Sequence, residues 1–323
     1  MSTLHMAAPL VSVIIPNFNH AAFLRERIRS VLGQTVADLE VILLDDASTD
    51  DSVLVMRAFT SDPRVTHVVV NEVNSGSPFH QWRKGMALAR GTWVWIAESD
   101  DSCAPDLLER LLKYHATDEV GLRYSQSRII DEDGIRKGSM LQHTVSFTPN
   151  PFAQDLVMPG AGFVHRFLKV KNVVPNASAV IFRRDLLDVP RIWEGTQNMR
   201  MCGDWLFWVR LASRTQVGFV AEELNHFREH AAVSRFHHTA ERQKRRLLEE
   251  RLVREELALV PGVDQRAEEA TLYAAWAKLF AVSSWLSMEV DAIRLSGRSR
   301  LAFLLSFLRY KWTARQAYRR QRG

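Results

Sequence analysis

Acidic and amide side chains follow three of the apolar segments in the first third of the chain. Pro16-Asn-Phe-Asn19 follows the first segment, Asp45-Asp46 follows the second, and Glu98-Ser-Asp-Asp101 follows a third. A single acidic pair at such a place is often a helix cap or a solvated turn. Three such groups at one edge of a parallel sheet indicate a ligand site instead, because ligands bind beyond the carboxyl ends of the strands.

Carboxylates brought this close repel one another unless a cation lies among them. Oxygen ligands favour Mg²⁺ or Mn²⁺ over zinc, and such an ion keeps waters and bridges phosphate oxygens. The chain has neither the G-x-x-x-x-G-K-[ST] nor the G-x-G-x-x-G pattern of glycine-rich phosphate loops. We therefore expect any bound phosphate to be held by a divalent metal ion.

Short apolar segments alternate with helical patterns over the first 120 residues, which predicts an α/β fold with βαβ units and a mostly parallel sheet. The expected strands are Val11–Ile15, Glu40–Leu44, Val65–Val70, Thr92–Ala97 and, later, Ala177–Phe182. The expected helices are Ala21–Gln34, one ending near Phe59, Phe79–Arg90, Pro105–His115 and Asp204–Ser213. Gln142–Gly162, with three prolines, predicts a long surface loop, and the chain from Ala240 onward is helical in pattern.

Composition excludes several classes of protein. With 323 residues, 46% apolar residues and nine Trp, the chain can bury a large core, which excludes disorder as its main state. Two cysteines, Cys103 and Cys202, are too few for a disulfide framework or a Cys-rich zinc site. No signal peptide precedes Leu10–Ile15, and no segment reaches the ~18 apolar residues that cross a bilayer. These features predict a cytoplasmic location.

Four motifs together resemble the family 2 glycosyltransferases with the GT-A fold. They are Val11-Ser-Val-Ile-Ile-Pro-Asn-Phe-Asn19, Ser30-Val-Leu-Gly-Gln-Thr35, Glu40-Val-Ile-Leu-Leu-Asp-Asp-Ala-Ser-Thr-Asp50 and Trp93-Val-Trp-Ile-Ala-Glu-Ser-Asp-Asp101. The resemblance implies a Rossmann-like catalytic domain at residues 1–238, with a nucleotide-binding half (9–120) and an acceptor half (121–238). Residues 239–323 then form a helical extension with a basic tail. The implied reaction is an inverting transfer of a sugar from a nucleoside-diphosphate sugar to an acceptor hydroxyl, in bacterial polysaccharide or glycoconjugate synthesis.

The same resemblance assigns the nucleotide pocket residue by residue. Pro16, Asn17 and Asn19 line it, and Asp46 accepts a hydrogen bond from the base. Asp100 holds the ribose, and Asp101 binds the divalent metal, Mn²⁺ or Mg²⁺. The family often has Asp where this chain has Glu98, which changes the first carboxylate of the set.

The resemblance also implies a general base and further donor contacts. In Cys202-Gly-Asp204, Asp204 is the expected base, although an acid at a helix start is also a common cap. His230, in Phe227-Arg-Glu-His230, is a candidate metal or phosphate ligand. Arg83 and Lys84 are candidate phosphate contacts, and solvated helix charges are the alternative.

The C-terminal segment is strongly basic. Residues 291–323 hold nine Arg or Lys and one acidic residue. A basic amphipathic helix is typical of membrane-surface segments, and packing on the catalytic domain is the alternative. We expect a glycan or lipid-linked glycan acceptor and a possible peripheral location at the inner membrane face. We expect no nucleic-acid partner, because the tail lacks the recognised nucleic-acid-binding modules.

A competing function is a non-catalytic nucleotide-sugar-binding or scaffold protein of a membrane-surface glycan assembly. The presence of Asp101 and Asp204 argues against it. A nucleotidyltransferase would have a glycine-rich first loop with Lys or Arg, which Pro16–His20 is not.

Overall fold

A computed structural model of the chain describes residues 8–113, 117, 119–189, 191–230 and 239–320. The described strands form a ten-stranded sheet in the order β3-β2-β1-β4-β9-β6-β10-β5, with β7 beside β6 and β8 beside β10. The strands are β1 Val11–Asn17, β2 Leu39–Asp45, β3 Val65–Val70, β4 Trp93–Ile96, β5 Ser102–Cys103, β6 Leu122–Ile130, β7 Arg136–Ser139, β8 Leu156–Pro159, β9 Val180–Arg183 and β10 Gln216–Arg228. The α-helices are α1 Ala21–Leu32, α2 Ser52–Arg57, α3 Pro78–Leu88, α4 Leu107–Lys113, α5 Gly160–Phe163, α6 Gly203–Ala212, α7 Ala240–Leu257, α8 Arg266–Lys278, α9 Met288–Asp291 and α10 Arg300–Arg320.

The first half of the sheet is parallel, as the alternating pattern predicts. β1 pairs in parallel with both β2 and β4, and β2 pairs in parallel with β3. All residues of β1 and β2 are buried, which explains their continuous apolar sequences, because helices cover both faces of such strands. The register sets Asn17 opposite Asp45. The polar ends of two strands therefore meet at one sheet edge.

The second half of the sheet is mixed. β9 lies antiparallel between β4 and β6, whereas β6 and β10 are parallel to each other. The 13-residue strand β10 was not among the expected elements, and its bulges interrupt the alternation that signals a strand. The expected loop 142–162 is also wrong in part, because it contains β8, which pairs with β10.

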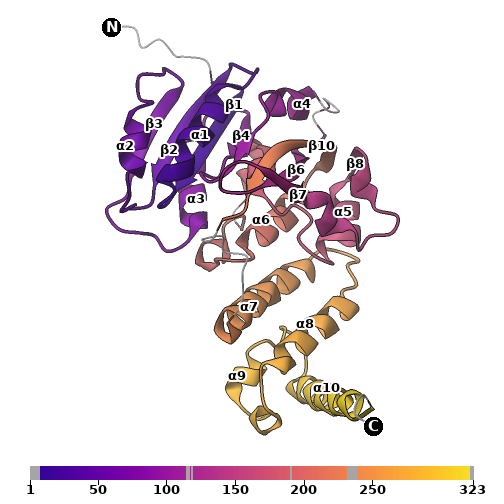
Figure 1. The fold of residues 1–323 in the computed structure, drawn as a ribbon. Coiled ribbons are helices and arrows are strands. Elements are labelled where there is room, and N and C mark those ends of the chain that lie inside the picture. The colour runs from indigo at the N-terminus through magenta and orange to yellow at the C-terminus, as the bar shows by residue number, and fades with distance from the viewer. Residues whose placement is uncertain (1–7, 114–116, 118, 190, 231–238, 321–323) are drawn as a thin grey trace.

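Helices pack on both faces of the sheet (Figure 1). One apolar cluster joins α1, α2 and α4 to one face, through side chains such as Val13, Ile15 and Leu43. The other cluster joins α3, α5 and α6 to the opposite face, through Ile14, Ile42 and Leu44. The alternation along each strand thus feeds two separate cores.

The C-terminal helices form a lobe below the sheet in Figure 1. Its first helix, α7, belongs in part to the apolar cluster that joins α3, α5 and α6 to the sheet, where its Val253 and Leu257 are fully buried. Helices α8 and α10 pack around a separate cluster with Trp276 and Phe303. The boundary expected at residue 238 lies outside the described residues.

Candidate active site

A pocket of about 540 Å³ opens at the carboxyl ends of β1, β2 and β4. Its lining includes Asp46, Asp101 and Asp204, which come from three distant parts of the sequence. Of the residues predicted from the sequence, Pro16, Asn17, Asp100 and His230 also line it, whereas Asn19, Arg83 and Lys84 do not. A cavity of this size suits a ligand as large as a nucleotide sugar.

The loops after β1 and β2 are joined by side-chain amides. Asn17 donates from Nδ2 to Asp45 at 2.9 Å and to Ser48 at 3.2 Å, while its buried Oδ1 has no partner among the described atoms. Asn19 accepts a 2.8 Å bond from the backbone N–H of Thr49. The Asn17 Oδ1 is therefore an unfilled, buried acceptor in a residue of the pocket lining, whereas Asn19 acts on the loop.

The Asp46 carboxylate is held by an array of donors. Oδ1 accepts bonds from Nδ2 of Asn71, the backbone N–H of Ser75 and Nε2 of Gln81, and Oδ2 accepts one from Oγ of Ser75. The Nε2 of Gln81 donates to Asp46, so that Oε1 is the atom of the Gln81 side chain left to accept a hydrogen bond. This oxygen is buried and has no partner among the described residues. Gln81 lines the pocket and was not predicted from the sequence.

The candidate metal ligands gather at residues 97–101 after β4, which we call the acidic loop. His230 Nε2 donates to Asp100 at 3.1 Å, and one ligand atom from each of His20, Asp100 and His230 lies within 4.8 Å of the other two. Burial acts to raise the pKa of Asp100, but the hydrogen bond from His230 and the charges of both histidines hold it below its ordinary value. The hydrogen bond to Asp100 in turn raises the pKa of His230. Sequence analysis missed His20, although it directly follows the first motif.

Asp101 lies deeper than Asp100. It is 1% exposed, and its oxygens accept bonds from Nδ2 of Asn176 and from the backbone N–H of Arg228. Burial, and next the charge of Asp100, raise the pKa of Asp101 to about 6. Its carboxylate still borders the pocket.

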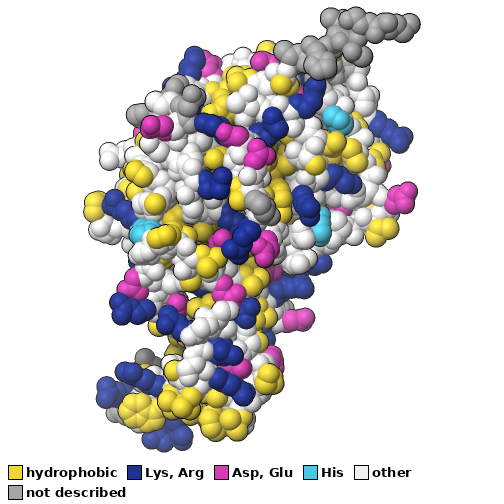
Figure 2. All heavy atoms as spheres, turned by 180° about the vertical axis from the view of Figure 1, so that it is seen from behind, with side chains coloured by type: hydrophobic (Ala, Val, Ile, Leu, Met, Phe, Trp, Pro, Cys, Tyr) yellow, Lys and Arg dark blue, Asp and Glu magenta, His cyan; other side chains and the backbone are white. Residues whose placement is uncertain are grey.

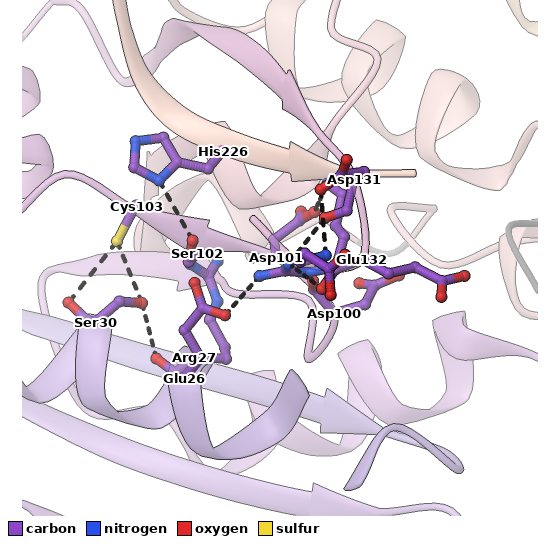
Figure 3. Close-up of polar contacts among 12 residues, drawn as sticks. Glu26, Arg27, Ser30, Asp100, Asp101, Ser102, Cys103, Asp131, Glu132 and His226 are labelled. Carbon is purple, nitrogen blue, oxygen red and sulfur yellow. Dashed lines mark hydrogen bonds and ion pairs between the residues drawn. The ribbon is translucent and has the colours of Figure 1, made fainter. Parts of the chain in front are cut away.

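Arg228 holds the acidic loop by donating from Nε to the backbone carbonyl of Asp100. Figure 3 shows Asp100 and Asp101 close to Asp131 and Glu132. The Arg228 side chain is 1% exposed and is not among the residues that line the pocket. The guanidinium donates to the Glu26 carboxylate and to the backbone carbonyls of Asp100, Asp131 and Glu132. The arginine of the Phe-Arg-Glu-His segment is thus a clamp that β10 supplies to the loop.

Glu98 and Trp82 form a second buried pair beside the acidic loop. Trp82 Nε1 donates to Glu98 at 2.8 Å, and the Glu98 backbone N–H donates to Oγ of Ser178. Burial and the charge of Asp100 raise the pKa of Glu98 to about 8 against the effect of the Trp82 hydrogen bond. Because Glu is one methylene longer than the Asp that the family often has here, the Glu98 carboxylate reaches the Trp82 indole on α3.

Asp204 is the second residue of α6, at the positive end of the helix dipole. Its Oδ2 accepts a 2.8 Å bond from Nδ2 of Asn172, and its Oδ1 accepts one from the N–H of Trp205. The preceding Gly203 packs against Phe79 of α3, where a Cβ would come within 2.4 Å of the ring. This close approach brings the start of α6 to the pocket rim.

Arg200 is the single Lys or Arg among the described residues that line the pocket. Its segment is held by Glu249 of α7, whose carboxylate accepts backbone N–H bonds from Arg200, Met201 and Cys202 at 3.0, 2.7 and 2.9 Å. Ser77 adds a 2.6 Å bond to the Met199 carbonyl. Helix α7 therefore helps to shape the site. No motif in the sequence had marked Arg200 or Glu249.

Arg83 and Lys84 lie on α3 outside the pocket lining. Arg83 donates to Gln197 at 3.0 Å, and the Lys84 ammonium donates to Asn71. Their role as phosphate contacts stays a prediction.

Comparison with known proteins places these features in context. The family model described as glycosyl transferase family 2 matches residues 12–174, half of the chain. The chain is 33% identical over 128 residues to chondroitin synthase of Escherichia coli, covering 39% of this chain and 18% of that protein. It is 31% identical over 140 residues to the putative teichuronic acid biosynthesis glycosyltransferase TuaG of Bacillus subtilis, covering 43% and 55%. The chain thus spans less than two thirds of both relatives.

Longer matches have lower identity. An uncharacterized protein of Mycobacterium tuberculosis, MT1568, is 27% identical over 301 residues, covering 91% of this chain and 88% of that protein. Staphylococcus aureus TarS 1–349 in complex with UDP has a TM-score of 0.62 at 14% identity, covering 95% and 91% of the chains. The mannosyltransferase PcManGT of Pyrobaculum calidifontis, in complex with GDP-Man and Mn²⁺, has a TM-score of 0.57 at 16% identity, covering 95% and 88%. These two structures share the fold with this chain.

Proposed function

Because the chain belongs to glycosyltransferase family 2, we propose that it transfers a sugar from a nucleoside-diphosphate sugar to an acceptor hydroxyl, with inversion at the anomeric carbon. The observation that carries this proposal is the convergence of Asp46, Asp101 and Asp204 on one pocket. A pocket with carboxylates from both halves of the domain can hold a donor at one end and an acceptor at the other.

Asp204 is the proposed general base. Asn172 orients its carboxylate at the start of α6, and an ionised carboxylate can accept a proton. The acceptor oxygen loses its proton to Asp204 as it bonds to the anomeric carbon. The bond from that carbon to the phosphate oxygen breaks on the opposite face, and the nucleoside diphosphate leaves. No covalent enzyme intermediate is required.

A divalent cation suits the acidic loop. The ion would be held by His20, Asp100, Asp101 and His230, of which Asp101 and His230 were predicted from the sequence as metal ligands. Imidazole nitrogens favour Mn²⁺ over the harder Mg²⁺. When bound, the ion offsets the negative charge that grows on the leaving diphosphate. Arg200 is the protein's own cation on this lining and would contact the diphosphate directly.

The nucleoside would lie against the ends of β1 and β2. The buried acceptors Asn17 Oδ1 and Gln81 Oε1 belong to residues that line this end of the pocket with Asp46, and a ligand that reaches them must supply N–H or O–H donors. A ribose and a base with a ring N–H, such as uracil or guanine, supply them. The neighbouring structures hold UDP, UDP-GlcNAc or GDP-Man, so both bases belong in a donor screen.

The acceptor is proposed to be a glycan or lipid-linked glycan of a bacterial surface polysaccharide. The names of the relatives support this class, since they concern chondroitin and teichuronic acid. Among the described residues, no helix is long and apolar enough to span a membrane. Independently of that finding, we propose a peripheral location at the inner face of the cell membrane, supported by the basic C-terminal helix α10.

Turnover of nucleotide sugars tests the function. A thermal-shift screen with Mn²⁺ and Mg²⁺ identifies the donor, because a bound ligand raises the unfolding temperature. Release of nucleoside diphosphate with a glycan acceptor then measures transfer. We expect Asp204→Asn to lower kcat by ~10²–10⁴-fold with unchanged donor affinity, and the exposed control Asp38→Asn to match the wild type. Full activity of Asp204→Asn would exclude this base, and donor binding without turnover in the wild type would favour a binding or scaffold protein.

A further inference from the structure

Helix α10 has two apolar faces, of which the structure covers one. Phe303, Leu304 and Phe307 are buried in the cluster of the C-terminal lobe. Leu301, Leu305 and Trp312 are 68%, 57% and 63% exposed. A helix that only packed on this lobe would need a single apolar face.

The exposed residues form a continuous stripe. Leu301, Leu305, Leu308 and Trp312 are spaced by four, three and four residues, which places them on one side of the helix. Leu308 is half-buried, and the other three are exposed. We call these four residues the outer stripe. At 100° per residue, its centre lies on the far side of α10 from the buried phenylalanines.

Cations surround the outer stripe. Helix α10 contains six Lys or Arg and no Asp or Glu. Four of these cations have neither an ion pair nor a hydrogen bond with any residue that the structure describes, namely Arg309, Arg315, Arg319 and Arg320. Figure 2 shows hydrophobic and basic side chains gathered together on the lower end of the molecule, where α10 lies. The face thus combines apolar area with positive charge that lacks partners.

We propose that the outer stripe docks α10 flat on an anionic lipid bilayer. Lipid supplies both things that this face lacks: acyl chains for the leucines and acidic headgroups for the arginines. Trp312, amphipathic and next to cations, suits the depth of the headgroups. The helix lies along the membrane surface. The C-terminal end of α10 is polar, and no described helix is long and apolar enough to span a membrane.

Two other occupants match the face less well. A second copy of the chain would set two acid-free helices against each other, so that the unpaired arginines would repel across the interface. A nucleic acid would neutralise the arginines but leave Leu301 and Leu305 against phosphates. The bilayer alone among these satisfies charge and apolar area together.

The docked helix would hold the enzyme at the membrane with its pocket in a fixed relation to the surface. α10 packs on α8, α8 packs on α7, and Glu249 of α7 binds the segment that leads to Asp204. This proposal concerns binding alone and does not depend on glycosyl transfer.

Vesicle flotation of the full chain tests it. With vesicles of 60% phosphatidylcholine and 40% phosphatidylglycerol, we expect the protein to float, and with pure phosphatidylcholine to bind at least tenfold more weakly. Raised salt should weaken the binding, because it screens the arginines. The variant Leu301→Ser/Leu305→Ser/Trp312→Ser should lose at least tenfold in binding while keeping its circular dichroism spectrum.

A matched control replaces three equally exposed apolar residues elsewhere, Leu54→Ser/Val73→Ser/Ile135→Ser, and should float like the wild type. A second variant, Arg309→Ser/Arg315→Ser/Arg319→Ser, should lose the preference for anionic vesicles. Equal binding to both vesicle types, or flotation that the outer-stripe variant retains, would overturn the proposal. So would a dimer in light scattering that the outer-stripe variant dissociates and that does not float.

Discussion

Replacing Glu249 by Gln tests whether α7 positions the candidate base. The Glu249 carboxylate is 7% exposed and accepts three backbone N–H bonds from residues 200–202, directly before α6. A Gln side chain keeps one acceptor oxygen and turns an NH₂ group toward the other position. At least one of the three charge-assisted bonds is therefore lost, which removes about 2 kcal/mol from the ordered position of this segment.

The expected kinetic effect follows from that free energy. If the 2 kcal/mol appears as a reduced population of the correctly placed Asp204, kcat falls about 30-fold, since each 1.36 kcal/mol is tenfold. Donor KM should also rise, because the same segment carries Arg200, but by a smaller factor than kcat falls, because Asn17, Asp46 and Gln81 are held by other bonds. Amide hydrogen exchange at residues 200–202 should accelerate in parallel.

The matched control is Glu241→Gln, an exposed glutamate at the start of the same helix, which should leave kcat and exchange unchanged. Wild-type kcat in Glu249→Gln would refute the positioning argument, as would a loss confined to donor KM. A fall in kcat without faster exchange at residues 200–202 would show that the effect arises elsewhere.

Further predictions concern the donor side of the pocket. Arg200→Ala should raise donor KM about tenfold through loss of a charge-assisted bond to the diphosphate, with Arg200→Lys intermediate, as initial-rate kinetics can measure; an unchanged KM would remove Arg200 from donor binding. Chelation with EDTA should abolish turnover and Mn²⁺ should restore it better than Mg²⁺, whereas full activity in EDTA would exclude a required cation. His20→Ala and His230→Ala should each raise the Mn²⁺ concentration for half-maximal activity, whereas unchanged titration curves would exclude them as ligands. Gln81→Leu should weaken nucleotide binding about tenfold in calorimetry, because a donor group of the ligand then meets no acceptor and Asp46 loses the hydrogen bond from Nε2; equal affinity would show that neither contact contributes to nucleotide binding.

The first half of the fold follows closely from local sequence. Continuous apolar strands such as Val11–Asn17 can be buried only between two helical layers, and their shared carboxyl edge follows from parallel pairing. This is why Asp46 and Asp101 could be expected near each other from motif order alone. The helical pattern from Ala240 onward likewise predicted helices at the C-terminus, such as α10.

The second half depends on long-range pairing that local pattern does not encode. Strand β10 joins β6 with two register shifts, and β8 pairs with it from a segment rich in proline. Sequence analysis gave Arg228 no role, whereas its burial and its bond to the backbone carbonyl of Asp100 make it a clamp on the acidic loop.

Motifs in the sequence do not identify residues whose role depends on tertiary contacts. Arg200 and Glu249 are 49 positions apart and meet only because α7 packs on α6. Gln81 becomes a candidate base contact only because its amide nitrogen is already committed to Asp46. In each case the role of the residue depends on hydrogen bonds made by the tertiary structure, which the local sequence pattern does not encode.

Crystals of the protein grown with Mn²⁺ and the donor's nucleoside diphosphate give the most direct test of a shared donor site. We expect an anomalous manganese peak in the pocket beside Asp100 and His230, and a diphosphate between this peak and Arg200. We expect Asp204 to face the open end of the same cavity. A manganese ion and nucleotide bound on any other surface, with these carboxylates left empty, would contradict it.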